Sequence, residues 1–244
     1  MLYQPTKPTV KNFRTNTVGR DFVVGDMHGC YKDFSNKLKE ISFDTEKDRM
    51  FSVGDLVDRG PDSMGCLRLI EKPWFHSVKG NHEDMMVGAL LEEDDNQYYG
   101  WLNNGGLWAR DCVETEEELI EWAKKARDLP IVINVACGEH MIGICHAQPP
   151  KSYDWKYIEN PASEVVMLWG RTRVTMHHKH VIKNIDWTFH GHTPVSKVAH
   201  LGNTTFLDTG CVFDEKYPLT VLEFSDKGVL NSQFIMRKSN EDAN

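Results

Sequence analysis

The chain has 244 residues, of which 40% are hydrophobic and 26% are charged, and its net charge is -8 at pH 7. This length and composition predict a folded globular protein with a large core. The acidic balance argues against a broad nucleic-acid-binding surface, which would need clustered lysine and arginine. Residues 1–20 contain no long apolar stretch, so we expect neither a signal peptide nor a membrane span there.

We expect an irregular N-terminal segment at residues 1–20, a single domain at 21–236 and a polar tail at 237–244. The six cysteines form no Cys-x-x-Cys pair, which indicates free and mostly buried thiols. They are Cys30, Cys66, Cys112, Cys137, Cys145 and Cys211. Free thiols are typical of a reducing compartment, so the expected location is the cytoplasm.

Short apolar runs alternate with helical patterns through the first part of the chain. Strands are predicted at 22–24, 50–53 and 75–78, and helices at 31–41, 64–70 and 83–91. Two consecutive β-α-β units favour an α/β fold with helices covering the sheet.

The segment 92–111 changes character, because an acidic run is followed by an aromatic run and then by the turn-rich residues 103–106. It is interpreted either as a solvated loop with a few anchoring residues or as a rim that shapes access to a site. Thr115 and Glu118 then form a capping-box pattern, which predicts a helix through residue 126.

The second half is rich in short strand patterns. They occur at 131–136, 140–145, 187–189, 204–207, 219–224 and 232–236. We therefore expect a second sheet that packs on the first.

Polar residues follow several of these predicted strands. Three segments carry them after the first three strands, and histidines or acids end three later strands. The first three segments are Gly25-Asp26-Met27-His28-Gly29, Gly54-Asp55-Leu56-Val57-Asp58-Arg59-Gly60 and Gly80-Asn81-His82-Glu83, and the later ones are Cys145-His146-Ala147, Phe189-His190-Gly191-His192-Thr193 and Asp208-Thr209-Gly210. Gly-Asp and Gly-Asn pairs are also common turn formers, so any one segment alone would be read as a turn.

Together these segments indicate a metal site at one sheet edge. The candidate ligands are Asp26, His28, Asp55, Asn81, His146 and His192. Carboxylate, imidazole and amide groups without a thiolate suit Mn²⁺, Fe or Zn²⁺ better than a closed structural zinc site. Six ligands exceed the need of one catalytic ion, whereas two ions that share Asp55 use them economically.

These segments resemble the calcineurin-like metallophosphoesterases. Further motifs resemble the small lambda-type serine/threonine protein phosphatases of phages and bacteria, and the resemblance covers residues 21–224. They are Asp58-Arg59-Gly60-Pro61, Leu168-Trp169-Gly170-Arg171, Gly191-His192-Thr193-Pro194 and Asp208-Thr209-Gly210. The resemblance implies a four-layer αββα sandwich with two mixed β-sheets flanked by helices.

The resemblance also implies a role for each site residue. Asp26, His28 and Asp55 would hold one ion, and Asp55, Asn81, His146 and His192 the other. Arg59, Arg171 and Asn81 would bind the phosphate, and His82, oriented by Asp58, would protonate the leaving oxygen. Arg173 lies close to Arg171, and Gly170 stands where relatives often carry serine.

The expected activity is hydrolysis of phosphoserine and phosphothreonine in proteins, with phosphotyrosine and phosphohistidine as further substrates, by direct attack of a hydroxide that bridges two divalent ions. Mn²⁺ is the expected ion, with Fe or Zn²⁺ as alternatives. Expected partners are phosphoproteins or phosphopeptides, with no nucleic acid and no membrane, and the oligomeric state stays open. The main alternative is a symmetrical dinucleoside polyphosphate hydrolase such as a diadenosine tetraphosphatase. An inactive metal-binding interaction module and a phosphodiesterase or nuclease are also considered.

Two further features are interpreted as structural. His190 lies one residue before Gly191 on a strand end and is expected to face away from the site. The histidine-rich tract 176–180 is expected to be a solvated loop near the rim of the active site.

Overall fold

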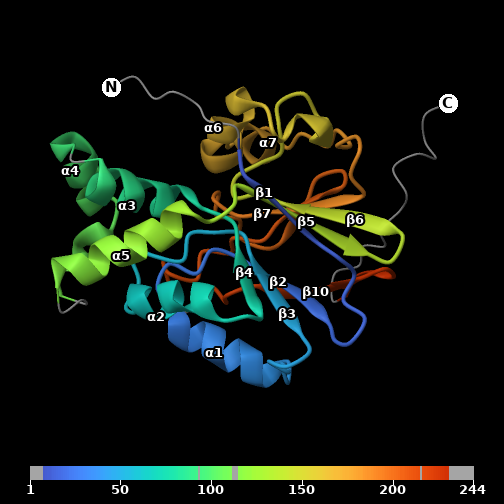
Figure 1. Ribbon diagram of the computed structural model, residues 1–244. Coiled ribbons are helices and arrows are strands. Elements are labelled where there is room, and N and C mark those ends of the chain that lie inside the picture. The colour runs from blue at the N-terminus through green and yellow to red at the C-terminus, as the bar shows by residue number, and fades with distance from the viewer. Residues whose placement is uncertain (1–7, 93, 112–114, 215, 231–244) are drawn as a thin grey trace.

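The computed structural model describes residues 8–92, 94–111, 115–214 and 216–230. Two β-sheets lie face to face, with helices outside both of them (Figure 1). One sheet has the strand order β1-β5-β6-β7-β9-β8, and the other has the order β11-β10-β2-β3-β4. Both sheets mix parallel and antiparallel pairs, so the expected sandwich of two mixed sheets flanked by helices is confirmed.

The first part of the chain folds as predicted. Strands β2 (Asp21–Val24), β3 (Arg49–Ser52) and β4 (Phe75–Ser77) pair in parallel. The helical turns between and after them are α1 (Tyr31–Glu40), α2 (Ser63–Leu67), η1 (Arg68–Glu71) and α3 (Asn81–Leu91). Helix α3 begins two residues before the predicted start, so two polar residues of the third segment lie in its first turn.

The segment 92–111 is helical, which corrects the expectation of a solvated loop. Helix α4 (Asp95–Asn103) is followed by the 3₁₀ helix η2 (Gly106–Arg110). The side chain of Asp94 accepts the first free N–H groups of α4, as an N-cap does. The next helix, α5 (Glu116–Arg127), begins where the capping-box pattern placed it, because Thr115 Oγ1 accepts the N–H of Glu118 at 3.1 Å.

Four of the six later strand patterns form one sheet. They are β5 (Val132–Cys137), β6 (His140–Ile144), β7 (Trp187–His190) and β9 (Thr204–Phe206), and the short β8 (Ala199–His200) extends them. Strand β10 (Val221–Ser225) instead joins the first sheet by pairing antiparallel with β2, and β11 (Gly228–Leu230) follows it. The pattern at 232–236 and the tail at 237–244 lie outside the described residues.

Several elements were not predicted. Strand β1 (Val10–Phe13) pairs in parallel with β5, so the N-terminal segment is not irregular throughout. Helices α6 (Pro161–Trp169) and α7 (Thr172–Thr175), preceded by the 3₁₀ helix η3 (Trp155–Tyr157), form the outer layer of the second sheet (Figure 1).

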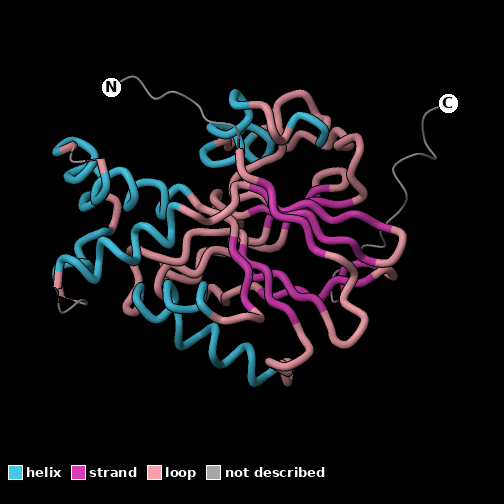
Figure 2. Tube along the Cα trace, in the orientation of Figure 1, coloured by secondary structure: helices cyan, strands magenta, loops and turns pink. Residues whose placement is uncertain are grey.

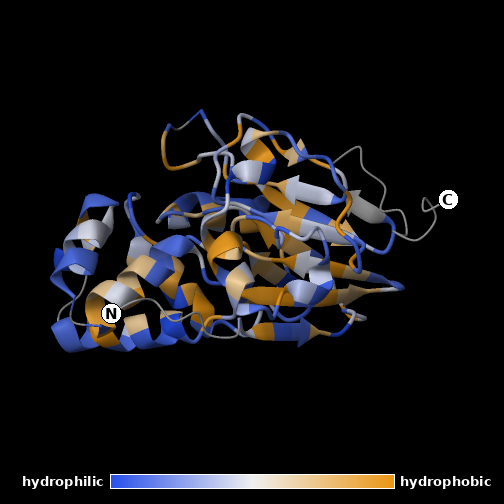
Figure 3. Ribbon diagram, turned by 90° about the horizontal axis from the view of Figure 1, so that it is seen from above, coloured by the Kyte–Doolittle hydropathy of each residue, from blue (hydrophilic) through white to orange (hydrophobic). Residues whose placement is uncertain are grey.

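One of the hydrophobic cores lies between the sheets. Val23 and Phe51 from the first sheet pack with Ile133, Ile144 and Phe189 from the second. Apolar residues accordingly concentrate in the strands at the centre of the molecule (Figure 3). Every residue of β2 is buried, as expected for a strand covered on both faces. Among the described residues, no helix has the length and apolar character needed to cross a membrane.

This packing places loops from both sheets together. Figure 2 shows the loops gathered between the strands and the group of helices α3, α4 and α5. Because parallel strands end at the same sheet edge, the turns after β2, β3, β4, β6 and β7 can meet there.

Candidate metal centre and cavity

The structure brings the predicted ligands from both sheets into one place. A carboxylate oxygen of Asp26, after β2, accepts the backbone N–H of His192, after β7, at 2.8 Å, although the two residues are 166 positions apart. The glycine before His192 permits this contact, since a Cβ on Gly191 would come within 1.7 Å of an oxygen of Asp26. The first and last predicted ligands therefore touch.

The turns that carry these residues have unusual backbone conformations. Nine described non-glycine residues have positive φ, and five of them are predicted site residues. These five are His28, Asp55, Asp58, Arg59 and His192. Left-handed conformations at non-glycine residues are unfavourable and cluster at functional sites. The packing around the turns thus maintains a side-chain arrangement that the backbone alone would not favour.

Asp55 is the centre of the cluster. Its Oδ2 lies 3.5 Å from Nε2 of His28 and 3.4 Å from Nε2 of His146, and its Oδ1 accepts the backbone N–H of His82 at 3.0 Å. Two groups of side chains can each hold a metal ion, and both contain Asp55. One group joins it to His28 and His82, and the other to His146 and His192. The shared carboxylate fits the predicted bridge between two ions.

Backbone carbonyls set the tautomers of two histidines. Nδ1 of His28 lies 2.9 Å from the carbonyl oxygen of Val57, and Nδ1 of His146 lies 2.7 Å from that of Val53. A carbonyl oxygen only accepts, so each Nδ1 carries a hydrogen, and each Nε2 faces Asp55 and offers its lone pair there in the neutral ring. This is the arrangement that metal-binding histidines usually adopt.

The donor set fits a cation, because electron-rich atoms face one another at short distances. Nε2 of His146 lies 2.8 Å from the amide oxygen of Asn81 and near Asp55 Oδ2. Nδ1 of His192 lies 2.6 Å from the same oxygen of Asn81, and the buried Oδ1 of Asp26 has no hydrogen-bond partner among the described residues. Buried acceptors without donors are costly, and a divalent cation would satisfy several of them at once.

Burial and charge determine the protonation of these groups. Burial lowers the pKa of His28 and of His192 to about 3, so both imidazoles are neutral at pH 7. Burial raises the pKa of Asp26 well above its usual range, and the nearby Asp208 adds to the effect. Asp55 and His146 stabilise each other's charged forms, so the pKa of Asp55 is held well below its usual value and the pKa of His146 is raised, although burial opposes both shifts. Buried acids crowded together with the neutral imidazoles of His28 and His192 favour the binding of a cation.

His82 has a different partner from the other histidines. Its Nδ1 lies 2.6 Å from a carboxylate oxygen of Asp58, which has no exposed surface. The indole N–H groups of Trp101 and Trp108 donate to the same carboxylate, at 3.1 and 2.6 Å. Both tryptophans come from the 92–111 segment, so this segment holds the Asp58 carboxylate in place through buried contacts. The interpretation of the segment as a rim did not predict these contacts.

Sequence reasoning assigned no role to Glu83 or Asp208. The carboxylate of Glu83 accepts the backbone N–H groups of Asp55, Leu56 and Gly80 at 2.9, 2.7 and 2.8 Å. It therefore fixes the turn that carries Asp55. Burial raises the pKa of Asp208 to about 6, and this residue belongs to a motif that the sequence had already singled out.

A cavity of about 210 Å³ opens over the cluster. Its lining includes the two predicted phosphate-binding arginines together with His82 and Asn81. Nη1 of Arg59 lies 2.7 Å from Nε2 of His28, and Nη1 of Arg171 donates to the carbonyl oxygen of His192 at 3.1 Å. Two guanidinium groups beside a cluster of acids and histidines can bind a phosphate group.

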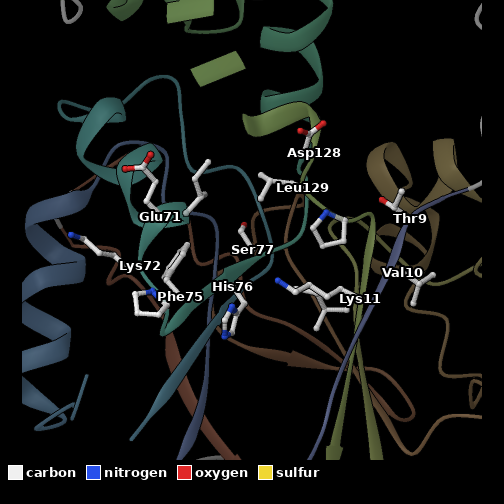
Figure 4. A pocket seen from close by; sticks show the side chains of 14 residues that line it. Thr9, Val10, Lys11, Glu71, Lys72, Phe75, His76, Ser77, Asp128 and Leu129 are labelled. Atoms are coloured by element: carbon white, nitrogen blue, oxygen red, sulfur yellow. The ribbon is translucent and has the colours of Figure 1, made fainter. Parts of the chain in front are cut away.

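A larger cavity of about 500 Å³ lies elsewhere, between β1 and β4 (Figure 4). Lys11, Lys72, Glu71 and Asp128 line it, with both signs of charge, and none of the predicted site residues do. The chemistry therefore concentrates in the smaller cavity. His190 does not line that smaller cavity either, and it is buried with Nδ1 2.9 Å from the carbonyl oxygen of Cys145, in line with the structural interpretation.

Comparisons with known proteins agree with this geometry. A model of the calcineurin-like phosphoesterase family matches residues 22–196. The chain is 35% identical over 208 residues to serine/threonine-protein phosphatase 1 of Salmonella typhimurium, which covers 83% of this chain and 91% of the relative. It is 36% identical over 194 residues to serine/threonine-protein phosphatase 2 of Escherichia coli K12, with 78% and 86% covered.

A solved structure described as a putative diadenosine tetraphosphatase shares the fold, with a TM-score of 0.60 and 20% identity over 94% of this chain and 96% of that one. Because the family model matches well over half of the residues, the chain belongs to the calcineurin-like phosphoesterase family.

Proposed function

We propose that the chain is a metal-dependent phosphomonoesterase that removes phosphate from phosphoserine and phosphothreonine in proteins. The observation that carries the proposal is the buried Asp58–His82 pair at 2.6 Å beside the acid and histidine cluster. The relatives named as serine/threonine-protein phosphatases support the same substrate class.

We propose that two divalent ions bind here. Asp26, His28 and Asp55 would hold one, and Asp55, Asn81, His146 and His192 the other. Mn²⁺ is the proposed ion, with Fe or Zn²⁺ as alternatives, because the donors are oxygens and imidazoles without a thiolate. When bound, such a pair polarises the phosphoryl group and lowers the pKa of water in the cavity.

The arginines would bind the phosphoryl oxygens, together with Asn81. A planar guanidinium matches phosphate geometry and can donate two parallel hydrogen bonds. Arg59 donates to Nε2 of His28 in this structure, and a metal ion on that nitrogen would compete for the same lone pair. Metal binding would therefore release Arg59 toward the substrate.

His82 would supply the proton that the leaving group needs. The alkoxide of serine or threonine is a poor leaving group and requires protonation as the ester bond breaks. Asp58 accepts from Nδ1 of His82 and stabilises the imidazolium form, which leaves the Nε2 proton for the cavity that His82 lines. A pyrophosphate leaving group needs less protonation, so this pair favours a monoester over a dinucleoside polyphosphate.

A substrate panel tests the proposal directly. Purified protein loaded with Mn²⁺ is assayed on a phosphoserine peptide and on diadenosine tetraphosphate, and the assay is repeated after chelation and with Fe²⁺ or Zn²⁺. We expect hydrolysis of the peptide, loss of activity on chelation and the highest turnover with Mn²⁺. Faster turnover of diadenosine tetraphosphate than of the peptide would favour the alternative function.

We also propose a reducing, cytoplasmic setting. The five described cysteines, Cys30, Cys66, Cys137, Cys145 and Cys211, are free thiols, and all except Cys211 are buried. Thiol labelling of the denatured protein immediately after extraction from its host should show them reduced. Oxidised cysteines in that experiment would argue for another compartment.

A further inference from the structure

Another cavity, of about 240 Å³, adjoins the phosphate cavity along the chain, because Thr172 and Arg173 in its lining directly follow Arg171, which lines the phosphate cavity. Gln148, in its lining, comes two residues after the candidate ligand His146, and Arg173, also in its lining, comes two residues after Arg171. The residues that follow Arg171 therefore lead from the phosphate cavity to this one.

The cationic side chains that line this cavity are those of Lys151 and Arg173. His178 also lines it, and among the described residues its lining contains no carboxylate. The hydroxyl of Thr172, an exposed residue, is also in the lining and can donate a hydrogen bond. Such a set of donors suits an anion.

Arg173 is unusual because it is a buried cation without a counter-ion. Only 3% of the surface of Arg173 is exposed, and among the described residues its guanidinium forms no ion pair. One nitrogen, Nη2, donates to the carbonyl oxygens of His180 and Leu201, but Nε and Nη1 have no hydrogen-bond partner in the part of the chain that the structure describes. Burial lowers the pKa of this guanidinium to about 10. An unpaired buried charge is costly, and an anion would offset that cost.

Neighbouring residues hold Arg173 in place. Its backbone N–H donates to the side-chain oxygen of Gln148 at 2.9 Å, and its guanidinium carbon lies 5.9 Å from the centre of the Tyr153 ring. The hydroxyl of Tyr153 lies 3.3 Å from Nδ1 of His178, and the ring of His180 stacks on that of Tyr153. The histidine-rich tract 176–180 therefore forms part of the wall of this cavity.

We propose that this cavity is an anion subsite that binds an acidic group flanking the phosphorylated residue of a phosphoprotein. The group is a carboxylate or a second phosphate, and the inference rests on the proposed phosphatase function. A purely structural role of Arg173 accounts for the two carbonyl contacts of Nη2. It does not account for Nε and Nη1, which lack partners among the described residues, or for the presence of Lys151 and His178 in the lining of the same cavity.

The test compares three sets of phosphoserine peptides of one length. The first set has neutral flanking residues. The second has an aspartate placed one, two, three or four residues from the phosphoserine, and the third has a second phosphoserine at the same positions. For the wild-type protein, we expect kcat/KM to be about tenfold higher for the best acidic peptide than for the neutral one, mainly through KM. The aspartate and diphosphorylated peptides distinguish a carboxylate from a phosphate as the bound group.

Lys151→Glu is the diagnostic variant, because this side chain is exposed and lies outside the phosphate cavity. It should remove the preference for acidic peptides while leaving turnover of p-nitrophenyl phosphate unchanged. Lys183→Glu is the matched control, since Lys183 is also exposed and lines neither cavity. Arg173→Lys, checked by thermal melting, should weaken the same preference in part.

Equal kcat/KM for neutral and acidic peptides in the wild type would overturn the subsite, and so would equal effects of the two glutamate variants. Failure of the proposed function itself would give another result. In that case no phosphopeptide, neutral or acidic, is hydrolysed although p-nitrophenyl phosphate is, and the subsite proposal falls with it.

Discussion

Histidines on the two sides of the site have different partners, and the difference indicates different tasks. His28 and His146 each point Nδ1 at a backbone carbonyl oxygen, at 2.9 and 2.7 Å. His82 points Nδ1 at the carboxylate of Asp58 at 2.6 Å. A carbonyl fixes a neutral tautomer that can bind a metal, whereas a carboxylate stabilises the protonated ring that can donate a proton.

The surroundings reinforce this difference. The fully buried Asp58 carboxylate accepts two indole N–H groups, from Trp101 and Trp108. Asp55 instead lies within 4.0 Å of three imidazoles, with its backbone fixed by Glu83. One carboxylate is thus arranged to orient a proton donor, and the other to bridge cations. The predictions below separate these two tasks.

The largest effect is expected for Asp55→Asn. An amide cannot bridge two cations as a carboxylate does, so both metal content and turnover should fall, with activity reduced by at least about 10³-fold. Metal analysis by mass spectrometry and a p-nitrophenyl phosphate assay measure the two quantities on one preparation. Full occupancy of both ions in this variant would remove the bridging role.

Next in size is the effect of His82→Asn, which should lower kcat on a phosphoserine peptide by about 10²–10⁴-fold while the metal stays bound. The ring is replaced by a group that cannot donate a proton of suitable acidity. His76→Asn serves as a control, because His76 lies on β4 and lines the other cavity. If His82→Asn lost its metal, the distinction between the two kinds of histidine would fail.

A smaller effect is expected for Trp108→Phe. The change removes the 2.6 Å indole donor from Asp58 but keeps an aromatic ring, so kcat should fall by about tenfold without loss of metal. Trp122→Phe is the matched control, since Trp122 lies on α5 in the same helical layer. Equal effects of the two variants would indicate general destabilisation rather than an effect through Asp58.

The smallest effect concerns the scaffold. Thr115→Ala removes the side-chain oxygen that caps α5 and should lower the free energy of unfolding by about 1 kcal/mol, with kcat unchanged. Urea unfolding together with a peptide assay measures both quantities. A reduced kcat at full folding would show that α5 influences the site more directly than its distance along the chain suggests.

The meeting of the ligands could be predicted from the sequence because it follows from local rules. Apolar runs mark the strands, parallel strands end at one edge, and the polar residues after them must gather there. Asp26 and His192 came together in this way although they are far apart in the chain. The roles assigned to these residues remain predictions until the variants above are measured.

The contacts that hold the site in place could be predicted less well than the meeting of the ligands. Trp101 and Trp108 lie in a segment whose acidic and turn-rich composition hid α4, although Asp94 before the spaced aromatic residues was a capping signal. Strand β10 was assigned to the wrong sheet because local alternation does not say which strand is the partner. Tertiary packing decided both features.

The most direct test of the account measures how turnover depends on the leaving group. Wild-type protein and the His82→Asn variant, with metal content verified, are assayed on a series of phosphate monoesters whose leaving groups range from nitrophenols to simple alcohols. The account predicts similar rates for the two proteins on p-nitrophenyl phosphate and a loss that grows steadily as the leaving group becomes more basic. An equal loss across the whole series would contradict a proton donated by His82.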